Sequence, residues 1–337
     1  MNRRHLTRWL AAALLPAATL AASGAARAQA QAPAGAYPAA SRTIRFVVPY
    51  PPGGPTDLMA RMLAPEMQKR LGANVIIDNK GGAGGNLGTG EVARQQPADG
   101  YTLLLAASGP MAVNASLYRS LPFDPLKDLA PVVQLSAFPL VFEVHPSLGV
   151  KTVKEFMALA QAGKVPLSYA SAGNGTPQHL AGELFNTMVH TELKHIPYRG
   201  AGPALNDLLG GQVNVMFDIL GSSLPYLQTG KLQPLAVTSA HRVATLPQVP
   251  TMAEAGIAGY EFTAWHGIAV RAGTPQPIVD KLNATVIAIF QDPAFRTRWE
   301  AIGTPVVAST PAAFASLIRS DSERLGKLVK AAGVTVD

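Results

Sequence analysis

Short apolar runs with β character alternate with segments of helical periodicity from residue 41 to near the end of the chain. Ten such runs are predicted to be strands: 43–48, 74–78, 101–106, 132–135, 140–144, 167–170, 193–196, 213–217, 235–238 and 267–270. Several are apolar on consecutive residues, as expected where helices cover both faces of a parallel sheet. The alternation predicts an α/β fold with mainly parallel sheets flanked by helices. Because 337 residues exceed the usual size of one hydrophobic core, two lobes are expected.

The predicted helices between these strands have recognisable starts and ends. Thr152 and Glu155 form a capping box, and Thr176-Pro177 and Thr274-Pro275 mark two further N-termini. A helix over residues 57–71 ends at a glycine but contains Pro65 near its middle. A kink or a break is therefore predicted at that proline.

The first 30 residues have the pattern of a signal peptide. A basic start is followed by an apolar stretch over residues 10–22, and Ala28-Gln29-Ala30 is a plausible cleavage site. A membrane-spanning helix needs roughly 20 apolar residues, so no permanent anchor is predicted. Export to the periplasm is expected by the Sec route, with the twin-arginine route left open by Arg3-Arg4. Residues 31–41 are predicted to be a flexible lead-in.

Charge and composition exclude several classes of partner. The formal net charge is +7, but four of the 28 basic residues and none of the 21 acidic ones lie in the signal segment, which leaves 24 − 21 = +3. Lysine and arginine form no block with interleaved aromatic residues, so nucleic acid is not an expected partner. The chain has no cysteine, and its seven histidines show no metal-binding spacing. Neither a cofactor nor a metal is predicted.

Two strand-to-helix turns, residues 47–57 and 168–177, contain more glycine than a bare connection needs. Unpaired N–H groups and the positive dipole end of the following helix face such a turn, and glycine lets the backbone approach a ligand. The turns therefore predict an anion site without a buried lysine or arginine, and the alternative is a pair of tight connections. The candidate ligand contacts in them are Tyr50, Pro51, Gly53, Gly54, Thr56, Asp57, Ser171, Gly173, Asn174, Gly175 and Thr176.

A third glycine-rich turn, residues 79–90, invites comparison with nucleotide-binding loops. It lacks the Gly-Lys-[Ser/Thr] of a P-loop, and no acidic residue follows at the distance that a dinucleotide ribose requires. Gly84, Gly85 and Asn86 are therefore candidate contacts of a smaller ligand. Nucleotide binding is not expected.

Further polar candidates follow predicted strands or open predicted helices, and each has an ordinary structural alternative. They are Ser108, His179, Tyr198, Gly200 and Asp218. His179 lies in the first turn of a helix, where it reaches either a bound anion or solvent. Asp218 ends a strand, where it points into a crevice or caps a turn. We interpret Trp265-His266 as a packing element, and Arg199 as either a ligand contact or a surface charge.

Nucleophilic catalysis is weakly supported by the sequence. Ser108 and Ser171 are the candidate nucleophiles, but neither lies in Gly-x-Ser-x-Gly, and the spacing places no base beside them. The protein is therefore not expected to be an enzyme.

Several motifs together resemble the Bug family of substrate-binding proteins from tripartite tricarboxylate transporters. They are Pro49-Tyr50-Pro51-Pro52-Gly53-Gly54-x-x-Asp57, Asn79-x-x-Gly82-Ala83-Gly84-Gly85-Asn86, Asp99-Gly100-Tyr101-Thr102, Gly173-Asn174-Gly175-Thr176-x-x-His179-Leu180, Pro197-Tyr198-x-Gly200, Asp207-Leu208-Leu209-Gly210-Gly211-Gln212, Phe217-Asp218 and Pro250-Thr251-x-x-Glu254-Ala255-Gly256. The resemblance covers the chain from about Ser41 to the C-terminus, in order and at the family's spacing.

The resemblance implies a periplasmic, two-lobed Venus-flytrap fold of the type II binding-protein class, with the ligand in a cleft between the lobes. The chain would cross between lobes near Phe142 and near Trp265. Residues 42–142 and 266–337 would form lobe 1, and residues 143–265 would form lobe 2. In this family carboxylates are held largely by backbone amides and ordered waters of the first two loops. Tyr50 stands where phenylalanine is more frequent and Arg199 where lysine is, so the resemblance leaves open what the ligand's distal group is.

We therefore predict a monomeric binding protein for a small carboxylate, either an organic acid, an amino acid, an aromatic acid or a related amide. It would deliver the ligand to membrane transporter subunits. Two alternatives stay open: a sensory module that presents its ligand to a receptor kinase, and a secreted enzyme on the same fold. The glycine-loop model also predicts that valine at Gly54 or Gly175 removes binding with little loss of stability.

Overall fold

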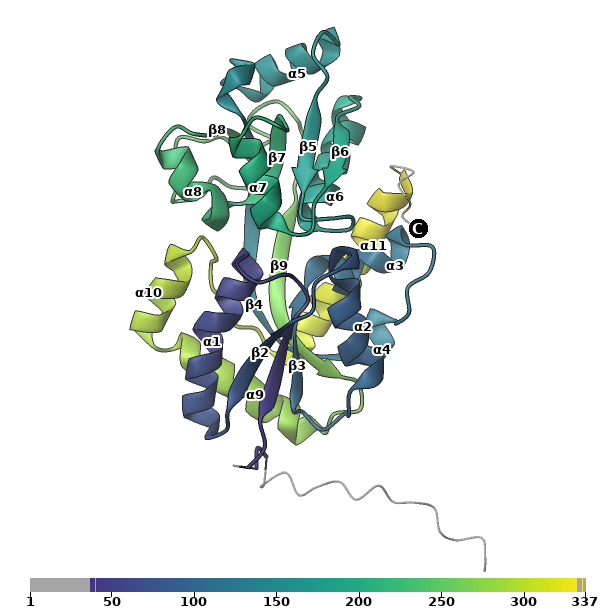
Figure 1. Ribbon diagram of the computed structural model, residues 1–337, viewed down its shortest axis with the longest axis vertical. Coiled ribbons are helices and arrows are strands. Elements are labelled where there is room, and N and C mark those ends of the chain that lie inside the picture. Colours follow the sequence, from purple (N-terminus) through teal and green to yellow (C-terminus); the bar gives the residue numbers. More distant parts are fainter. Residues whose placement is uncertain (1–36, 40, 332–334, 336–337) are drawn as a thin grey trace, which may run out of the picture. The chain divides into compact units, whose positions relative to one another are not determined.

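A continuous mixed sheet organises the part of the chain that the computed structural model describes, namely residues 37–39, 41–331 and 335. The strand order is β2-β1-β3-β9-β4-β7-β5-β6, and β8 pairs with β4 (Figure 1). The predicted signal segment and its cleavage site lie outside the described residues. Within the described residues, no helix is both long and apolar enough to cross a membrane.

One end of the sheet is built from the predicted β-α-β-α-β order. It comprises β1 (Ile44–Val48), α1 (Pro55–Leu71), β2 (Val75–Asn79), α2 (Asn86–Gln95) and β3 (Thr102–Ala107). β1 is parallel to both β2 and β3, and every residue of β3 is buried. This burial explains the continuous apolar run in β3, because the strand lies inside the sheet with neighbours on both sides.

Two long antiparallel strands, β4 (Leu129–Val144) and β9 (Thr263–Arg271), form the middle of the sheet. The sequence predicted two strands over 132–135 and 140–144, which is wrong, because β9 pairs across the polar and proline-containing interval between them. Two register shifts, between Pro131 and Val133 and between Gln134 and Ser136, absorb the irregularity of β4.

The other end of the sheet again has parallel strands with helical connections. Its strands are β5 (Ser168–Ser171), β6 (Lys194–Pro197), β7 (Val215–Ile219) and β8 (Gln233–Val237). Its helices are α5 (Val153–Ala162), α6 (Pro177–Val189), α7 (Ala201–Leu209) and α8 (Leu220–Gln228). β5 is parallel to β6 and β7, whereas β7 and β8 are antiparallel to β4. The mainly parallel arrangement that the sequence predicts therefore holds away from the central strands.

The predicted crossing points between lobes, Phe142 and Trp265, lie on β4 and β9, the two strands in the middle of the sheet. The lobe boundaries themselves stay predictions. Phe142 stacks on Phe217 with ring centroids 4.7 Å apart and also contacts the rings of Phe156 and Phe185. This aromatic cluster ties α5 and α6 to the sheet.

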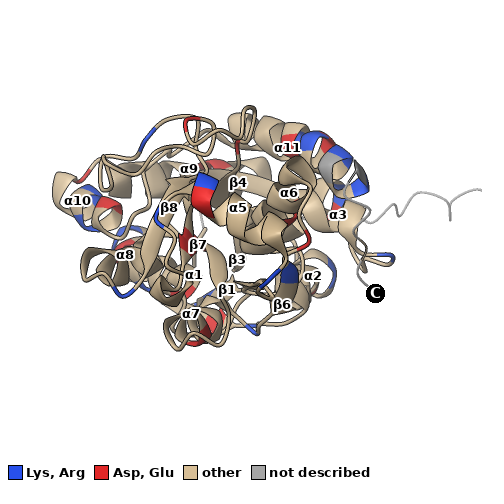
Figure 2. Ribbon diagram, turned by 90° about the horizontal axis from the view of Figure 1, so that it is seen from above, with Lys and Arg blue, Asp and Glu red and all other residues tan. Residues whose placement is uncertain are grey.

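Three C-terminal helices complete the unit: α9 (Gln276–Phe290), α10 (Pro293–Ala301) and α11 (Pro311–Ala331). Acidic and basic residues are interspersed along α10 and α11 (Figure 2). The indole Nε1 of Trp265 donates to Asp321 Oδ2 at 2.7 Å, which fixes α11 to β9. Short helical segments lie between the other elements: η2 (Ala83–Gly85), η3 (Gly109–Val113), α3 (Asn114–Leu117), α4 (Pro125–Asp128) and η4 (Pro146–Leu148).

Local signals at the helix ends are partly confirmed. Thr152 Oγ1 accepts the Glu155 N–H as the capping box predicts, and Gly72 ends α1 in the left-handed conformation. The alternative of a break at Pro65 is wrong, because α1 continues through it, and the alternative of a kink stays a prediction. Pro65 is exposed, so water can solvate the carbonyl that its missing N–H leaves free.

The described end of the predicted lead-in is packed rather than free. Tyr37 is buried, and its hydroxyl donates to the Gly100 carbonyl at 2.7 Å. Its ring also meets Tyr101 edge to face. Residues 37–39 therefore lie against the end of the sheet, where the sequence predicted a flexible segment up to residue 41.

Candidate ligand-binding site

A cavity of about 270 Å³ opens where the glycine-rich loops of the two ends of the sheet meet. The loops that follow β1, β5 and β6 form its walls, and residues of β7 and β9 complete it. It is lined by Tyr50, Pro51, Pro52, Gly53, Gly54, Pro55, Thr56, Ala172, Thr176, Pro177, Gln178, Arg199, Gly200, Ala201, Gly202, Pro203, Asn206, Ile219 and His266. Arg199 is the one ionised side chain among these residues, and it is exposed. The walls are therefore almost free of charged side chains.

Three helices, α1, α6 and α7, begin at this cavity, with Gly54, Thr176 and Gly200 as their N-caps. Intrahelical hydrogen bonds start only at the N–H groups of Leu58 and Leu180 in the first two helices. The earlier amide groups have no acceptor within their helices, and each helix adds a positive dipole end worth roughly half an elementary charge. This arrangement attracts an anion through the backbone.

Asp57 shapes the first loop from behind rather than from the cavity wall. Its carboxylate accepts the Gly53 N–H at 2.9 Å, the Asn79 amide at 3.0 Å and the Arg61 Nε–H at 2.8 Å. Burial alone would raise the pKa of Asp57, but these three hydrogen bonds outweigh burial and lower the pKa. Asp57 is thus a charged, fully bonded support for the turn.

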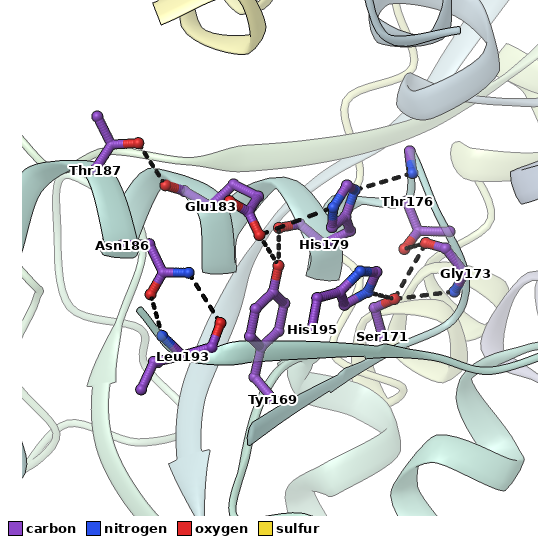
Figure 3. Close-up of polar contacts among 11 residues, drawn as sticks. Tyr169, Ser171, Gly173, Thr176, His179, Glu183, Asn186, Thr187, Leu193 and His195 are labelled. Carbon is purple, nitrogen blue, oxygen red and sulfur yellow. Dashed lines mark hydrogen bonds and ion pairs between the residues drawn. The ribbon is translucent and has the colours of Figure 1, made fainter. Parts of the chain in front are cut away.

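Ser171 and Thr176 hold the second loop from its buried side (Figure 3). Thr176 is the N-cap of α6 as predicted, but its Oγ1 donates to the Gly173 carbonyl at 2.7 Å and makes no hydrogen bond to the helix. Ser171 Oγ accepts the Gly173 N–H at 3.1 Å and lies 2.6 Å from His195 Nε2. The Gly175 N–H donates to His179 Nδ1 at 3.1 Å. These contacts fix the loop so that the start of α6 faces the cavity.

Three stacked rings support these hydrogen bonds (Figure 3). His195 lies between Tyr169 and His179, with ring centroids 4.8 and 4.1 Å away. Burial lowers the pKa of His179 to about 4, and burial together with the neighbouring His179 lowers the pKa of His195 to about 3. Both imidazoles are therefore neutral at neutral pH, and neither supplies a positive charge to an anion.

The serine and histidine beside each other do not form an accessible nucleophile. The 2.6 Å contact between Ser171 and His195 supplies the base that the sequence did not place. Ser171 is nevertheless fully buried, and neither residue lines the cavity. The contact between Ser171 and His195 therefore fixes the shape of the loop. The described residues also contain no group of three or more histidine, aspartate or glutamate side chains arranged to hold a metal ion.

Comparison with known proteins shows the family to which the chain belongs. Residues 59–334 match the family model TctC, described as the tripartite tricarboxylate transporter family receptor. The chain belongs to this family. It is 37% identical to protein BugT of Bordetella pertussis over 298 residues, covering 88% of this chain and 90% of BugT.

Solved structures of similar proteins agree with the family and with the type II binding-protein fold. Rpa4515 of R. palustris, solved with adipate, gives a TM-score of 0.84 at 35% identity and covers 89% of this chain and 99% of that chain. MatC of Rhodopseudomonas palustris, solved with malate, gives 0.82 at 34% identity and covers 86% and 99%. The family is one of periplasmic binding proteins, not of enzymes.

In this TctC-family protein the candidate residues from the sequence fall into three groups. The cavity is lined by Tyr50, Pro51, Gly53, Gly54, Thr56, Thr176 and Gly200. An adjoining cavity of about 540 Å³ is lined by Gly84, Gly85, Gly173, Asn174 and Tyr198. Buried behind the walls of both are Asp57, Asn86, Ser108, Ser171, Gly175, His179 and Asp218.

Three of the candidates buried behind the walls make hydrogen bonds to other protein groups. Asn86 Oδ1 accepts the Asn114 amide at 2.6 Å, and His179 accepts from Gly175 instead of reaching an anion or solvent. The Asp218 carboxylate does not line the cavity but accepts the Gln178 amide at 3.2 Å. Their positions as direct ligand contacts thus stay predictions without support from the lining of the cavity.

Sequence reasoning missed three polar residues of the cavity wall, Gln178, Asn206 and His266. Gln178 is the second residue of α6, and its position directly after Thr176-Pro177 was a usable signal. His266 lies on β9, where we interpreted the sequence as packing. Its ring does pack on Phe138 with centroids 4.9 Å apart, yet it also borders the cavity.

Proposed function

We propose that this protein captures a small carboxylate-bearing metabolite in the periplasm and passes it to the membrane subunits of a tripartite tricarboxylate-type transporter. The convergence of three helix N-termini on one cavity carries the proposal. Adipate and malate in the related structures support the carboxylate class, and the family description supports the transporter as partner.

Binding in this proposal is noncovalent and uses backbone groups from both ends of the sheet. A carboxylate that contacts α1 from one end and α6 or α7 from the other bridges them, and so favours the arrangement in which the loops are close. The transporter would recognise that arrangement. Arg199, exposed at the rim, is the side chain available to a second anionic group of the ligand.

Isothermal titration of the purified protein tests the carboxylate class. The panel pairs acids with uncharged analogues of the same shape, such as nicotinate with nicotinamide and succinate with succinamide. We expect binding of one or more acids and at least tenfold weaker binding of the matched amides. A protein that binds amides as well as acids, or binds no acid of the panel, contradicts the proposal.

An uptake experiment tests the transport role separately. Cells lacking this protein should lose accumulation of the labelled acid identified by titration, and the intact chain should restore it. Normal uptake with a lost transcriptional response to the acid would instead support the sensory alternative.

A further inference from the structure

Two nearly buried polar side chains border the cavity with hydrogen-bonding atoms left over. Gln178 is 2% exposed and His266 is 4% exposed. Among the described residues, Gln178 Oε1 has no donor, and His266 Nδ1 is buried without a partner. Gln178 lines the cavity, so its Oε1, which accepts no hydrogen bond from the described residues, is available to a ligand group. His266 Nδ1 is enclosed by the protein, so the other ring nitrogen, Nε2, is the one that a ligand in the cavity can reach.

Asp218 determines which atom of the Gln178 side-chain amide is available to a ligand. Its Oδ1 accepts the Gln178 Nε2–H at 3.2 Å, while its Oδ2 accepts from Ser222 Oγ at 2.6 Å. A carboxylate only accepts hydrogen bonds, so the amide nitrogen of Gln178 must face Asp218. The carbonyl end, Oε1, is therefore the one available to the cavity.

A second buried acid explains why Asp218 carries the charge. Glu143 is fully buried, and Ser223 Oγ lies 2.7 Å from its Oε1 and 3.1 Å from Asp218 Oδ2. Burial raises the pKa of both acids, and the charge of Asp218 raises the pKa of Glu143 further. Asp218 also receives donors from Gln178 and Ser222, whereas Glu143 shares only Ser223. The proton of the pair therefore resides on Glu143.

His266 offers the opposite polarity on the same cavity. Burial lowers its pKa to about 4, so the ring is neutral and carries one N–H. A buried N–H without an acceptor costs more than a buried bare nitrogen, because an unmet donor loses a strong interaction with water. We therefore assign the bare nitrogen to the buried Nδ1 and the N–H to Nε2. One acceptor and one donor suit a hydroxyl group, which both donates and accepts.

We propose that Asp218 is a positioning residue for ligand selectivity: it holds the Gln178 amide nitrogen, presents Oε1 to the cavity, and thereby selects carboxylates that carry a hydroxyl group. This inference rests on the proposed carboxylate binding. Because Gln178 also supplies a free backbone N–H at the start of α6, the hydroxyl belongs close to the carboxylate, as in a 2-hydroxy acid. A 2-oxo acid lacks the donor that Oε1 needs.

Titration with matched triplets tests this selectivity. The probes are malate, succinate and oxaloacetate, together with lactate, propionate and pyruvate. In the wild-type protein we expect the hydroxy acid of a bound triplet to bind about tenfold more tightly than the plain and oxo acids, the effect of one well-placed hydrogen bond. Equal affinities within a bound triplet overturn the inference but leave the proposed function standing. Failure of all acids to bind overturns both.

The variant Asp218→Asn separates positioning from bulk. Its amide can donate to Gln178 Oε1, so Gln178 can turn and present Nε2–H to the cavity. We expect the preference for the hydroxy acid to disappear and the 2-oxo acid to bind more tightly than it binds the wild type. Asp280→Asn, which removes an exposed negative charge, is the control and should keep the wild-type affinity ratios. An unchanged preference in folded Asp218→Asn contradicts the inference.

Gln178→Met keeps the test decisive if Asp218→Asn does not fold. It removes the acceptor at nearly constant volume and should abolish the hydroxyl preference without any gain for the oxo acid. A retained preference in this variant overturns the assignment of Oε1.

Discussion

The carbonyl oxygen of Asn174 occupies the space that a side chain on Gly84 would need. A Cβ added to Gly84 would lie 2.0 Å from this oxygen, and Gly84 also has a φ of +62°. The loop after β2 and the loop after β5 therefore meet through bare backbone. Tyr118 marks the same contact, because its hydroxyl donates to the Asn174 carbonyl at 3.2 Å.

Gly84→Ala should weaken ligand binding by keeping these loops apart. Contacts of Cβ below 3.0 Å are essentially never seen, so the loops must separate by about 1 Å. We expect at least a tenfold loss of affinity for the best acid of the panel, measured by titration. Gly210→Ala, whose φ is −82° and whose nearest atom is 3.4 Å away, is the control. Equal affinity of Gly84→Ala and wild type would show that binding does not need this contact.

The two glycines that the sequence treats alike, Gly54 and Gly175, should respond differently to valine. Gly54 has a φ of −85° and nothing within 4 Å of a Cβ, so its side chain would enter the cavity and block ligand at a stability cost of about 1 kcal/mol. Gly175 has a φ of +76°, and its Cβ would lie 2.2 Å from Asn114 Oδ1. Gly175→Val should therefore lose about 3 kcal/mol of stability. Thermal melts without ligand distinguish the two, and equal melting points would contradict this account.

Much of the binding loop was predictable because its signals are local. The glycines and prolines between residues 49 and 57 and between 173 and 177 determine the backbone there, and the structure places both loops at one cavity. Which residues of the loops face the cavity and which support its wall was not predictable. Whether a carboxylate such as Asp57 or Asp218 faces ligand or supports the wall depends on partners up to 40 residues away in the chain.

The dependence on partners distant in the chain also explains the features of the sheet that the sequence did not predict. A single strand across residues 129–144 is stabilised by pairing with β9, which lies over 120 residues later in the sequence. Local patterning instead suggested a break near Pro139. His266 was misjudged for a related reason, because a strand residue that packs on one neighbour can still border a cavity that other segments form.

The neutral His195 should make stability depend on pH. Its folded pKa of about 3 lies below the ordinary value of 6.5, so the unfolded chain binds the proton first and stability falls as pH drops below 6.5. Between pH 6.5 and 4 the wild type should lose about 1.4 kcal/mol per pH unit more than His195→Gln. Urea unfolding at several pH values measures the difference, and His241→Gln, an exposed histidine, should show no such divergence. Parallel curves for His195→Gln and wild type would refute the buried, neutral assignment.

The buried Glu143 should make stability depend on pH in the opposite direction. Burial and the charge of Asp218 raise its folded pKa well above 4.5, so the unfolded chain loses the proton first and stability falls as pH rises through that range. Glu143→Gln removes this penalty and should gain stability relative to wild type as the pH rises above 4.5. Glu323→Gln, an exposed glutamate, is the control. A constant difference across this range would place the shared proton elsewhere and weaken the argument for a charged Asp218.

Arg199 should discriminate between acids with one and two carboxylates. Its guanidinium is exposed at the rim of the cavity, where a charge pair contributes about 0.2–1 kcal/mol and is screened by salt. Arg199→Gln should therefore weaken a dicarboxylate about two- to fivefold at low ionic strength and leave a monocarboxylate unchanged. The difference should shrink in 0.5 M salt, where charges are screened beyond roughly 4 Å. Lys231→Gln, an exposed lysine away from the cavity lining, controls for net charge. Equal losses for mono- and dicarboxylates in Arg199→Gln would mean that the arginine holds the first carboxylate, and that the helix N-termini do not act alone.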